Sequence, residues 1–249
     1  MLVRAQDGEA LAIGQLSHAW LSGQLARAWG NDAFEAPEPR EEVVLGAEQH
    51  DIGWALFDQE PRLDRASGMP RGFLQTTVAE HLQIWRGAAV RLMSQSLHAA
   101  FVVSMHGRAL SELRAQAAPA EQAGALHEHA AEESARQDLL RGTLGVTEEH
   151  AAFTRRQMWT WDGLSLALCL GWQPFTAKDV PGREGLTDMQ LLDRGQGTWC
   201  LDPWPFGSER VEVRCEARRL QGGYADDASL RRAFEKAEPV TLEYLLLPS

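Results

Sequence analysis

The sequence has few cysteines and no long apolar run. Cys169, Cys200 and Cys215 fit neither a CxxC metal clip nor an even-numbered disulfide framework, which favours a reducing compartment. Residues 1–14 lack the apolar stretch of a signal peptide, and the apolar run 164–172 is too short to span a bilayer. We therefore expect a cytoplasmic protein that has no membrane partner.

Clusters of basic residues are absent as well. The chain has 24 Lys+Arg against 35 Asp+Glu, a net charge of −11, and no basic run is longer than a pair. Binding to duplex nucleic acid depends on neutralising many phosphates, so we expect no such partner. The GxSxG nucleophile motif and the glycine loops of Walker and Rossmann sites are also missing, which excludes those two classes.

Apolar periodicity predicts a largely helical N-terminal part. Two short apolar stretches flank Asp7-Gly8, a turn signal, and predict an N-terminal hairpin. Thr77 and Glu80 match a capping box at the start of one helix, and a long connection with several Gly and Pro precedes it. The expected helices cover residues 15–29, 40–54, 77–93, 99–113, 119–141 and 147–171.

The pattern changes after Gly171, where Gly and Pro recur between short runs. One such run is 198–201. Alternating residues predict a strand at 210–216, a further strand is expected at 241–247, and a helix is expected at 226–237. We therefore predict a mainly α fold, with a helical domain at 1–171 that includes the short hairpin. An antiparallel β-rich α+β segment at 172–249 is expected to pack on that domain.

An ordered series of side chains that can bind metal lies on the predicted helices. At 100° per residue, His18 shares an apolar face with Leu21 and Leu25, and its partners in the series face inward in the same way. Burial of so many polar groups is costly unless they are paired or bind a cation, although a single such histidine is more often an ordinary core residue. The series comprises His18, His50, Asp51, His81, His106 and Asp162.

The adjacent pair His50-Asp51 is the most distinctive part of the series. Together the two residues offer one neutral nitrogen and one anionic oxygen to the same ion, and Asp51 could bridge two ions. Mixed His and carboxylate ligation suits Fe, Mn, Zn or Ni, so one or two divalent ions are expected without a choice among them. His127 and His129, in contrast, lie in a predicted solvated helix and are expected at the surface.

The order His, His-Asp, His, His, Asp resembles the HD-domain superfamily of metal-dependent phosphohydrolases. The resemblance implies an HD-like helical fold and hydrolysis of a phosphoester, with a nucleotide or another small phosphorylated metabolite as substrate. It implies that the first ion is bound by His18, His50, Asp51 and Asp162. A second ion would involve His81 and His106, with Asp51 bridging and taking part in catalysis.

Four segments look closer still to a bacterial family, the domain of unknown function 3891, which has no assigned reaction. These segments are 15–19, 49–54, 104–106 and 162–166. Well-studied HD hydrolases have a lysine just after the doublet, and this chain has none there. A phosphate clamp would therefore come from Arg62, Arg65 or Arg71 in the long connection, and we assign Arg62 and Arg71 to it.

Two other functions are compatible with the same residues. Some HD-like proteins with six ligands resemble di-iron oxygenases, and a redox-active di-iron centre would favour that reaction. The histidines could instead form a structural metal site in a non-catalytic binding protein. The sequence does not determine the oligomeric state.

Overall fold

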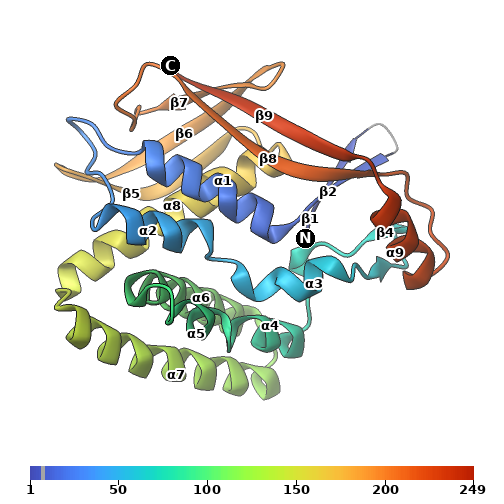
Figure 1. The fold of residues 1–249 in the computed structure, drawn as a ribbon, viewed down its shortest axis with the longest axis horizontal. Helices are drawn as coiled ribbons and strands as arrows, with labels where there is room; N and C mark the ends of the chain where they lie inside the picture. Colours follow the sequence, from blue (N-terminus) through green and yellow to red (C-terminus); the bar gives the residue numbers. More distant parts are fainter. Residues whose placement is uncertain (7–8) are drawn as a thin grey trace.

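Strands from both ends of the chain form one curved sheet (Figure 1). The computed structural model describes residues 1–6 and 9–249, and in these residues the strand order is β1-β2-β8-β9-β7-β6-β5. Neighbouring strands are antiparallel except β7 and β9, which are parallel. The strands are β1 (Leu2–Gln6), β2 (Glu9–Ile13), β5 (Phe175–Gly182), β6 (Gly185–Gly195), β7 (Thr198–Asp202), β8 (Val211–Leu220) and β9 (Pro239–Pro248).

The prediction of a mainly α, HD-like fold is therefore wrong, and the structure is α+β. The predicted N-terminal hairpin is present as β1 and β2, although its turn at Asp7-Gly8 lies outside the described residues. Strand β2 continues the sheet by pairing with β8, with Ala10 opposite Leu220 and Ile13 opposite Ala217. This pairing is formed by hydrogen bonds between distant segments, which local sequence patterns do not reveal.

The predicted helices are present, with two interruptions. The expected helix 40–54 stops at Glu48, and the expected helix 77–93 is two shorter helices. The Thr77 capping box is confirmed, because Glu80 N donates to Thr77 Oγ1 at 3.2 Å and Thr77 N donates to a Glu80 carboxylate oxygen at 2.7 Å. The helices are α1 (Gln15–Ala28), α2 (Arg40–Glu48), α4 (Val78–Trp85), α5 (Ala88–Leu92), α6 (Leu97–Ala117), α7 (Ala120–Leu144), α8 (Glu148–Leu170) and α9 (Asp227–Lys236).

The long connection before Thr77 contains short ordered elements. These are the 3-10 turn η1 (Ile52–Trp54), helix α3 (Ala55–Gln59), strands β3 (Leu63–Asp64) and β4 (Met69–Pro70), and the 3-10 turn η2 (Phe73–Gln75).

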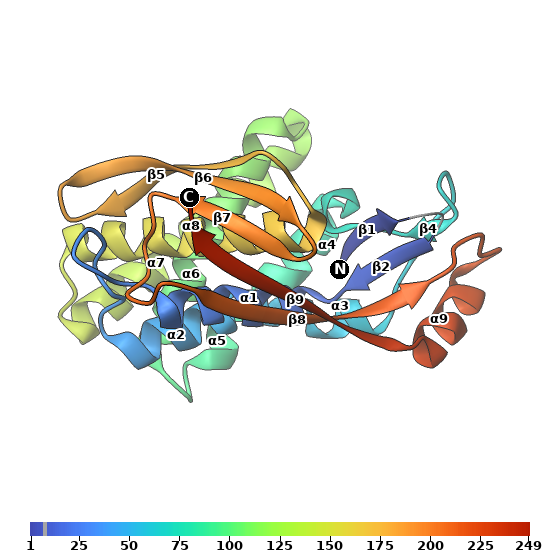
Figure 2. The ribbon, with the colours of Figure 1, turned by 90° about the horizontal axis from the view of Figure 1, so that it is seen from above.

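The molecule is layered, as Figures 1 and 2 show. The sheet lies over α1 and α8, and α6 and then α7 follow on the far side of those helices. Val213 and Cys215 on β8 belong to the same buried apolar cluster as Leu21 and Leu25 of α1. In the part of the chain that the structure describes, no helix has both the length and the apolar character needed to cross a bilayer.

Helix α7 is more buried than its composition suggests. Leu126, His129, Ala130 and Glu133 follow one another at helical spacing and form the face that packs on α6. The expectation that His129 lies at the surface is therefore wrong, because a polar side chain occupies an inward position in this helix. His127 is exposed, as expected.

A close backbone contact fixes the chain just after the His-Asp pair. Gly53 in η1 lies so near α4 that a Cβ at this position would overlap the carbonyl oxygen of Ile84. A backbone carbonyl inside a helix cannot move aside as the end of a flexible side chain can. Only glycine therefore allows η1 to approach α4 this closely.

We expect Gly53→Ala to lower the free energy of unfolding by about 1–3 kcal/mol, because the added methyl group overpacks the η1–α4 contact. Gly124→Ala is the matched control, since a Cβ at this position in α7 meets nothing within 4 Å. The control should stabilise the protein by up to about 1 kcal/mol, as alanine does in an exposed helix. Urea denaturation measures both variants, and equal stability would contradict the close contact.

Candidate metal centre

Four segments that are distant in the sequence bring the central side chains together. His18 lies on α1, His106 on α6 and Asp162 on α8, each buried on the face that the sequence predicts. The predicted helical placement of His50 and Asp51 is wrong, because both residues lie in the turn between α2 and η1. The turn directs the neighbouring side chains to one point, whereas neighbours on a helix are about 100° apart.

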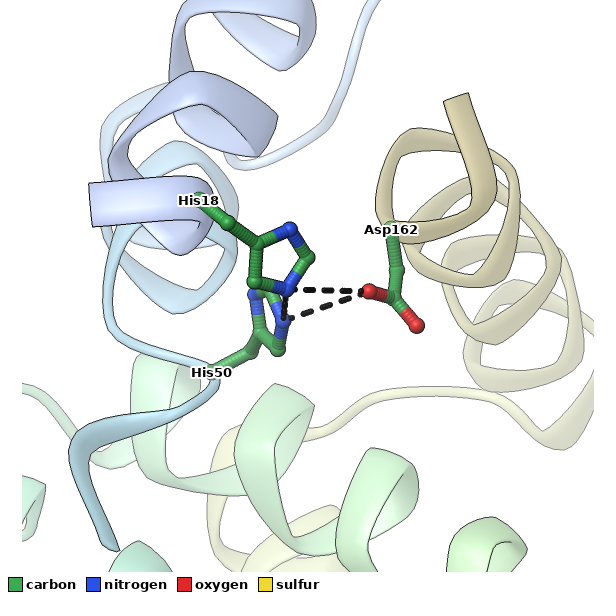
Figure 3. A group of neighbouring side chains, drawn as sticks. All are labelled: His18, His50 and Asp162. Atoms are coloured by element: carbon green, nitrogen blue, oxygen red, sulfur yellow. Dashed lines mark hydrogen bonds and ion pairs between the residues drawn. The ribbon is translucent and has the colours of Figure 1, made fainter. Parts of the chain in front are cut away.

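The histidine nitrogens and one carboxylate oxygen converge closely (Figure 3). His18 Nε2 lies 3.2 Å from His50 Nε2, and these atoms lie 3.3 and 3.5 Å from Asp162 Oδ1. With bonds of about 2.1 Å, neighbouring ligand atoms around one ion are about 3.0–3.4 Å apart. The spacing of His18, His50 and Asp162 therefore suits a transition-metal ion.

Asp51 adds a fourth oxygen beside the two imidazoles. Its Oδ2 lies 3.2 Å from His18 Nε2 and 3.5 Å from His50 Nε2. The structure thus brings together the four residues that the HD resemblance assigns to a first ion.

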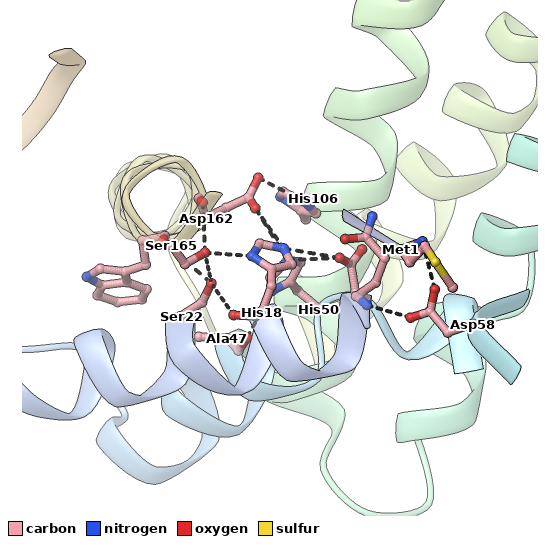
Figure 4. A network of polar contacts seen from close by, with 12 residues as sticks. Met1, His18, Ser22, Ala47, His50, Asp58, His106, Asp162 and Ser165 are labelled. Carbon is pink, nitrogen blue, oxygen red and sulfur yellow. Dashed lines mark hydrogen bonds and ion pairs between the residues drawn. The ribbon is translucent and has the colours of Figure 1, made fainter. Parts of the chain in front are cut away.

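Hydrogen bonds around the centre orient both rings (Figure 4). His50 Nδ1 donates to the carbonyl oxygen of Ala47 at 2.9 Å. His18 Nδ1 lies 2.7 Å from Ser165 Oγ, which itself donates to the carbonyl oxygen of Asp162 and so accepts from the ring. Because both Nδ1 atoms are engaged in these outer hydrogen bonds, the two Nε2 atoms face each other. Such outer hydrogen bonds are typical of metal-binding histidines.

The charges of the centre also favour a cation. Burial works to lower the pKa of His50, but Asp51 and Asp162 outweigh it and raise that pKa to about 9. Burial likewise works to raise the pKa of Asp162, but His50, His106 and His18 hold it well below its usual range. The buried carboxylates thus stabilise a positive charge next to His50, which is the field that a metal ion requires.

The centre opens onto a cavity of about 330 Å³, a size typical of small-molecule sites. His18, Asp51, His106 and Asp162 contribute polar groups to its wall. Apolar side chains line the remainder, including Trp54, Phe73, Trp85, Leu110 and Leu166. A centre at a cavity wall leaves a coordination position for a ligand, as catalytic metal sites do.

His106 is the next side chain beyond the four-residue group. Its Nε2 lies 3.6 Å from Asp162 Oδ2, and burial lowers its pKa to about 4, so the ring is neutral. One oxygen of Asp162 therefore faces His18 and His50 while the other faces His106. This geometry favours Asp162 as a bridge between two ions, the role that the sequence analysis gives to Asp51.

His81 lines the cavity but lies apart from the group. Its Nε2 is 2.9 Å from Ser111 Oγ. The ring of Trp85 contacts both His81 and His106, with centroid distances of 6.3 and 5.6 Å. The role of His81 as a ligand of a second ion stays a prediction.

Arg62 and Arg71, the predicted phosphate clamp, both form ion pairs with Glu80, the latter at 3.0 Å. Burial opposes ionisation of Glu80, yet bonds from Thr77 and Arg71 lower its pKa to about 2. The two arginines line a smaller cavity of about 40 Å³ and are absent from the lining of the larger one. Their predicted role in phosphate binding has no direct geometric support.

Sequence analysis missed two residues of the cavity wall. Arg114 donates to Thr76 Oγ1 at 3.0 Å and to the Thr76 carbonyl oxygen, which holds its guanidinium in place. Gln15 is buried, and its Oε1 has no hydrogen-bond partner within 1–6 and 9–249. Helical spacing could have found both, because Arg114 lies about two turns after His106 and Gln15 about one turn before His18.

The fold and this geometry define an α+β protein with a candidate metal centre formed by His18, His50 and Asp162. The chain belongs to the family described as protein of unknown function (DUF3891), whose family model matches residues 1–222. This confirms the resemblance to that family, whereas HD-superfamily membership stays a prediction. No curated protein and no solved structure matches the chain.

We expect protein purified without a chelator to contain about one equivalent of a transition metal, and His18→Ala to abolish its binding. Ser165→Ala should weaken metal affinity by about 10–100-fold, because the bond that orients His18 is lost. Ser104→Ala is the control, since this buried serine bonds α7. Elemental analysis and competition with a chromophoric chelator measure these effects. Equal affinities in the two serine variants would contradict the orienting role.

Proposed function

We propose that this protein is a metal-dependent phosphohydrolase that cleaves a small phosphoester, with one ion bound by His18, His50, Asp51 and Asp162. The observation that carries the proposal is the convergence of two imidazole Nε2 atoms and two carboxylates at a cavity wall. A divalent ion at such a site polarises a phosphoryl oxygen and lowers the pKa of water.

The residues of the cavity supply binding and orientation. Arg114 is the cation on this wall that is free of a carboxylate partner among the described residues, and its planar donors suit phosphate oxygens. Gln15 Oε1 accepts a hydrogen bond from water or from a substrate hydroxyl. The apolar wall around Trp85 and Leu110 excludes water and packs against the organic part of the substrate.

The size and chemistry of the cavity indicate the substrate class. About 330 Å³ admits a small molecule, and the apolar lining favours a planar or hydrophobic group next to the phosphate. Nucleotides and other small phosphorylated metabolites fit this description. The ordered set His, His-Asp, Asp supports the chemistry of HD-type sites, and the α+β fold contributes nothing to this argument.

A di-iron oxygenase is a second candidate, and one observation favours it. Asp162 places one oxygen near His18 and His50 and the other 3.6 Å from His106, as a carboxylate between two ions would. The identity of the metal separates the two functions. Two redox-active iron ions favour the oxygenase, whereas zinc excludes it.

We expect Asp51→Asn to remove metal and to lower the rate of phosphoester hydrolysis at least about 100-fold, because the amide keeps the shape but loses the charge. A screen with 4-nitrophenyl phosphate and nucleotides supplies the assay, and circular dichroism checks folding. Asp188→Asn, at an exposed carboxylate, is the control and should leave both readouts unchanged. Retained metal and full turnover in folded Asp51→Asn would contradict the proposal.

The number of metal ions bound per protein in two histidine variants would reveal a second ion. If Asp162 bridges two ions, His106→Ala should lower the metal content from two equivalents to one while the first ion stays bound. His81→Ala should leave the metal content unchanged, because its Nε2 bonds Ser111. Elemental analysis measures both, and a single equivalent in the wild type with no change in His106→Ala would assign His106 to the cavity wall alone.

A further inference from the structure

A chain of buried polar side chains leads from the cavity into the contact between α6 and α7. His81 Nε2 lies 2.9 Å from Ser111 Oγ, which lies 2.8 Å from His129 Nδ1. His129 Nε2 in turn lies 3.9 Å from Glu133 Oε1. Ser111 and His129 are 0% exposed and Glu133 is 3% exposed, so solvent does not satisfy these groups. Burying these polar groups costs desolvation free energy, which makes the chain a candidate for a functional role.

The single hydroxyl proton of Ser111 permits two arrangements of this chain. Ser111 can donate to His129 Nδ1 and accept from His81 Nε2, or it can do the reverse. Glu133 favours the first arrangement, because its carboxylate stabilises a proton on His129 Nε2 and that nitrogen has no other partner among the described residues. Arg136 Nε lies 3.3 Å from both oxygens of Glu133, which fixes the position of the carboxylate.

The favoured arrangement leaves His81 with a proton on Nε2 and a lone pair on Nδ1. His81 lines the cavity, and Nδ1 has no hydrogen-bond partner in the described part of the chain. The guanidinium of Arg114 lines the same cavity, so a second proton, and with it a positive charge, is unfavourable on this ring. A proton that arrives at Nδ1 must therefore leave through Nε2.

We propose that His81 accepts a proton from the water that attacks the phosphoester, that Ser111 conducts a proton from His81 to His129, and that Glu133 stabilises the proton there. The inference rests on the proposed function, since it assigns the base of the same cavity. His81 is the catalytic residue, because it lines the cavity that the substrate would occupy. The other three residues act through it and are positioning residues.

The step balances in atoms and charge. The water oxygen forms the bond to phosphorus, and the bond from phosphorus to the leaving aryl oxide breaks with its electron pair. One water proton passes to His81 Nδ1 while the Nε2 proton passes to Ser111. The Ser111 proton passes to His129 Nδ1, and the imidazolium that forms is stabilised by the carboxylate of Glu133, whose Oε1 lies 3.9 Å from His129 Nε2. At the end of the transfer the positive charge of the His129 ring is balanced by the carboxylate of Glu133.

The test compares two variants with a matched control, and 4-nitrophenyl phosphate is the probe because its leaving group needs no proton. Ser111→Ala breaks the chain, and Glu133→Gln keeps the shape of the side chain but removes the negative charge that stabilises a proton on His129. Each variant should lose about 100-fold in turnover with unchanged metal content. Ser104→Ala, which removes another buried hydroxyl of α6, should stay at the wild-type rate.

Nitrogen-15 NMR of the histidine rings supplies a readout that needs neither metal nor substrate. We expect His81 to be in the Nε2-protonated form in the wild type and in Glu133→Gln, and to become a mixture of forms in Ser111→Ala. A purely structural network predicts normal turnover in Glu133→Gln. An Nδ1-protonated His81 in the wild type, or wild-type turnover in both variants, would overturn the relay.

Failure of the proposed function gives a different result. A wild type without metal or hydrolysis would reject the phosphohydrolase and with it the catalytic role of His81, while the NMR spectra would still report the order of hydrogen bonds. Metal loss in His81→Ala would assign His81 to a second ion and would also overturn the relay. Active wild type with active Ser111→Ala rejects the relay alone.

Discussion

Two imidazole lone pairs and two carboxylates meet at one buried point, and this arrangement requires a positive charge. His18 and His50 cannot approach to 3.2 Å through unprotonated nitrogens unless a cation separates their lone pairs. Asp51 and Asp162 supply the negative field, which in the absence of a metal is balanced by a proton on His50. Helices α1 and α8 and the turn after α2 are packed so that these groups meet at one point.

The sheet contributes to the centre by holding α1. Gln24 donates to the carbonyl oxygen of Arg214 at 2.8 Å and accepts from its backbone N at 3.0 Å, which ties the helix to β8. Ser17 Oγ accepts from Glu216 N at 2.7 Å one residue before His18. On the other side, Gly53 lets the turn with His50 and Asp51 pack against α4. The centre thus lies between a rigid sheet-bound layer and a closely packed helical layer.

The chain from His81 to Glu133 is also built from buried histidines whose rings are oriented by neighbouring oxygens, but its geometry differs from that of the metal centre. In the candidate metal centre, neighbouring oxygens orient the rings so that both Nε2 atoms face the same point. In the chain from His81 to Glu133, a serine between two rings orients them in series, which suits proton movement rather than ion binding. Trp85 separates the two systems, and both reach the same cavity.

The sequence by itself determined the helices, the inward faces of His18, His106 and Asp162, and the choice of His50-Asp51, because helical periodicity and residue chemistry are local properties. Only the tertiary structure decided that the N-terminal hairpin and the C-terminal strands form one sheet, since β2 pairs with β8, which lies about 200 residues further along the sequence. It also decided that His129 is buried and that Arg114 rather than Arg62 or Arg71 faces the cavity. The burial of His129 depends on which helices pack together, and the position of each arginine depends on which carboxylate it pairs with. Local sequence patterns contain neither kind of information.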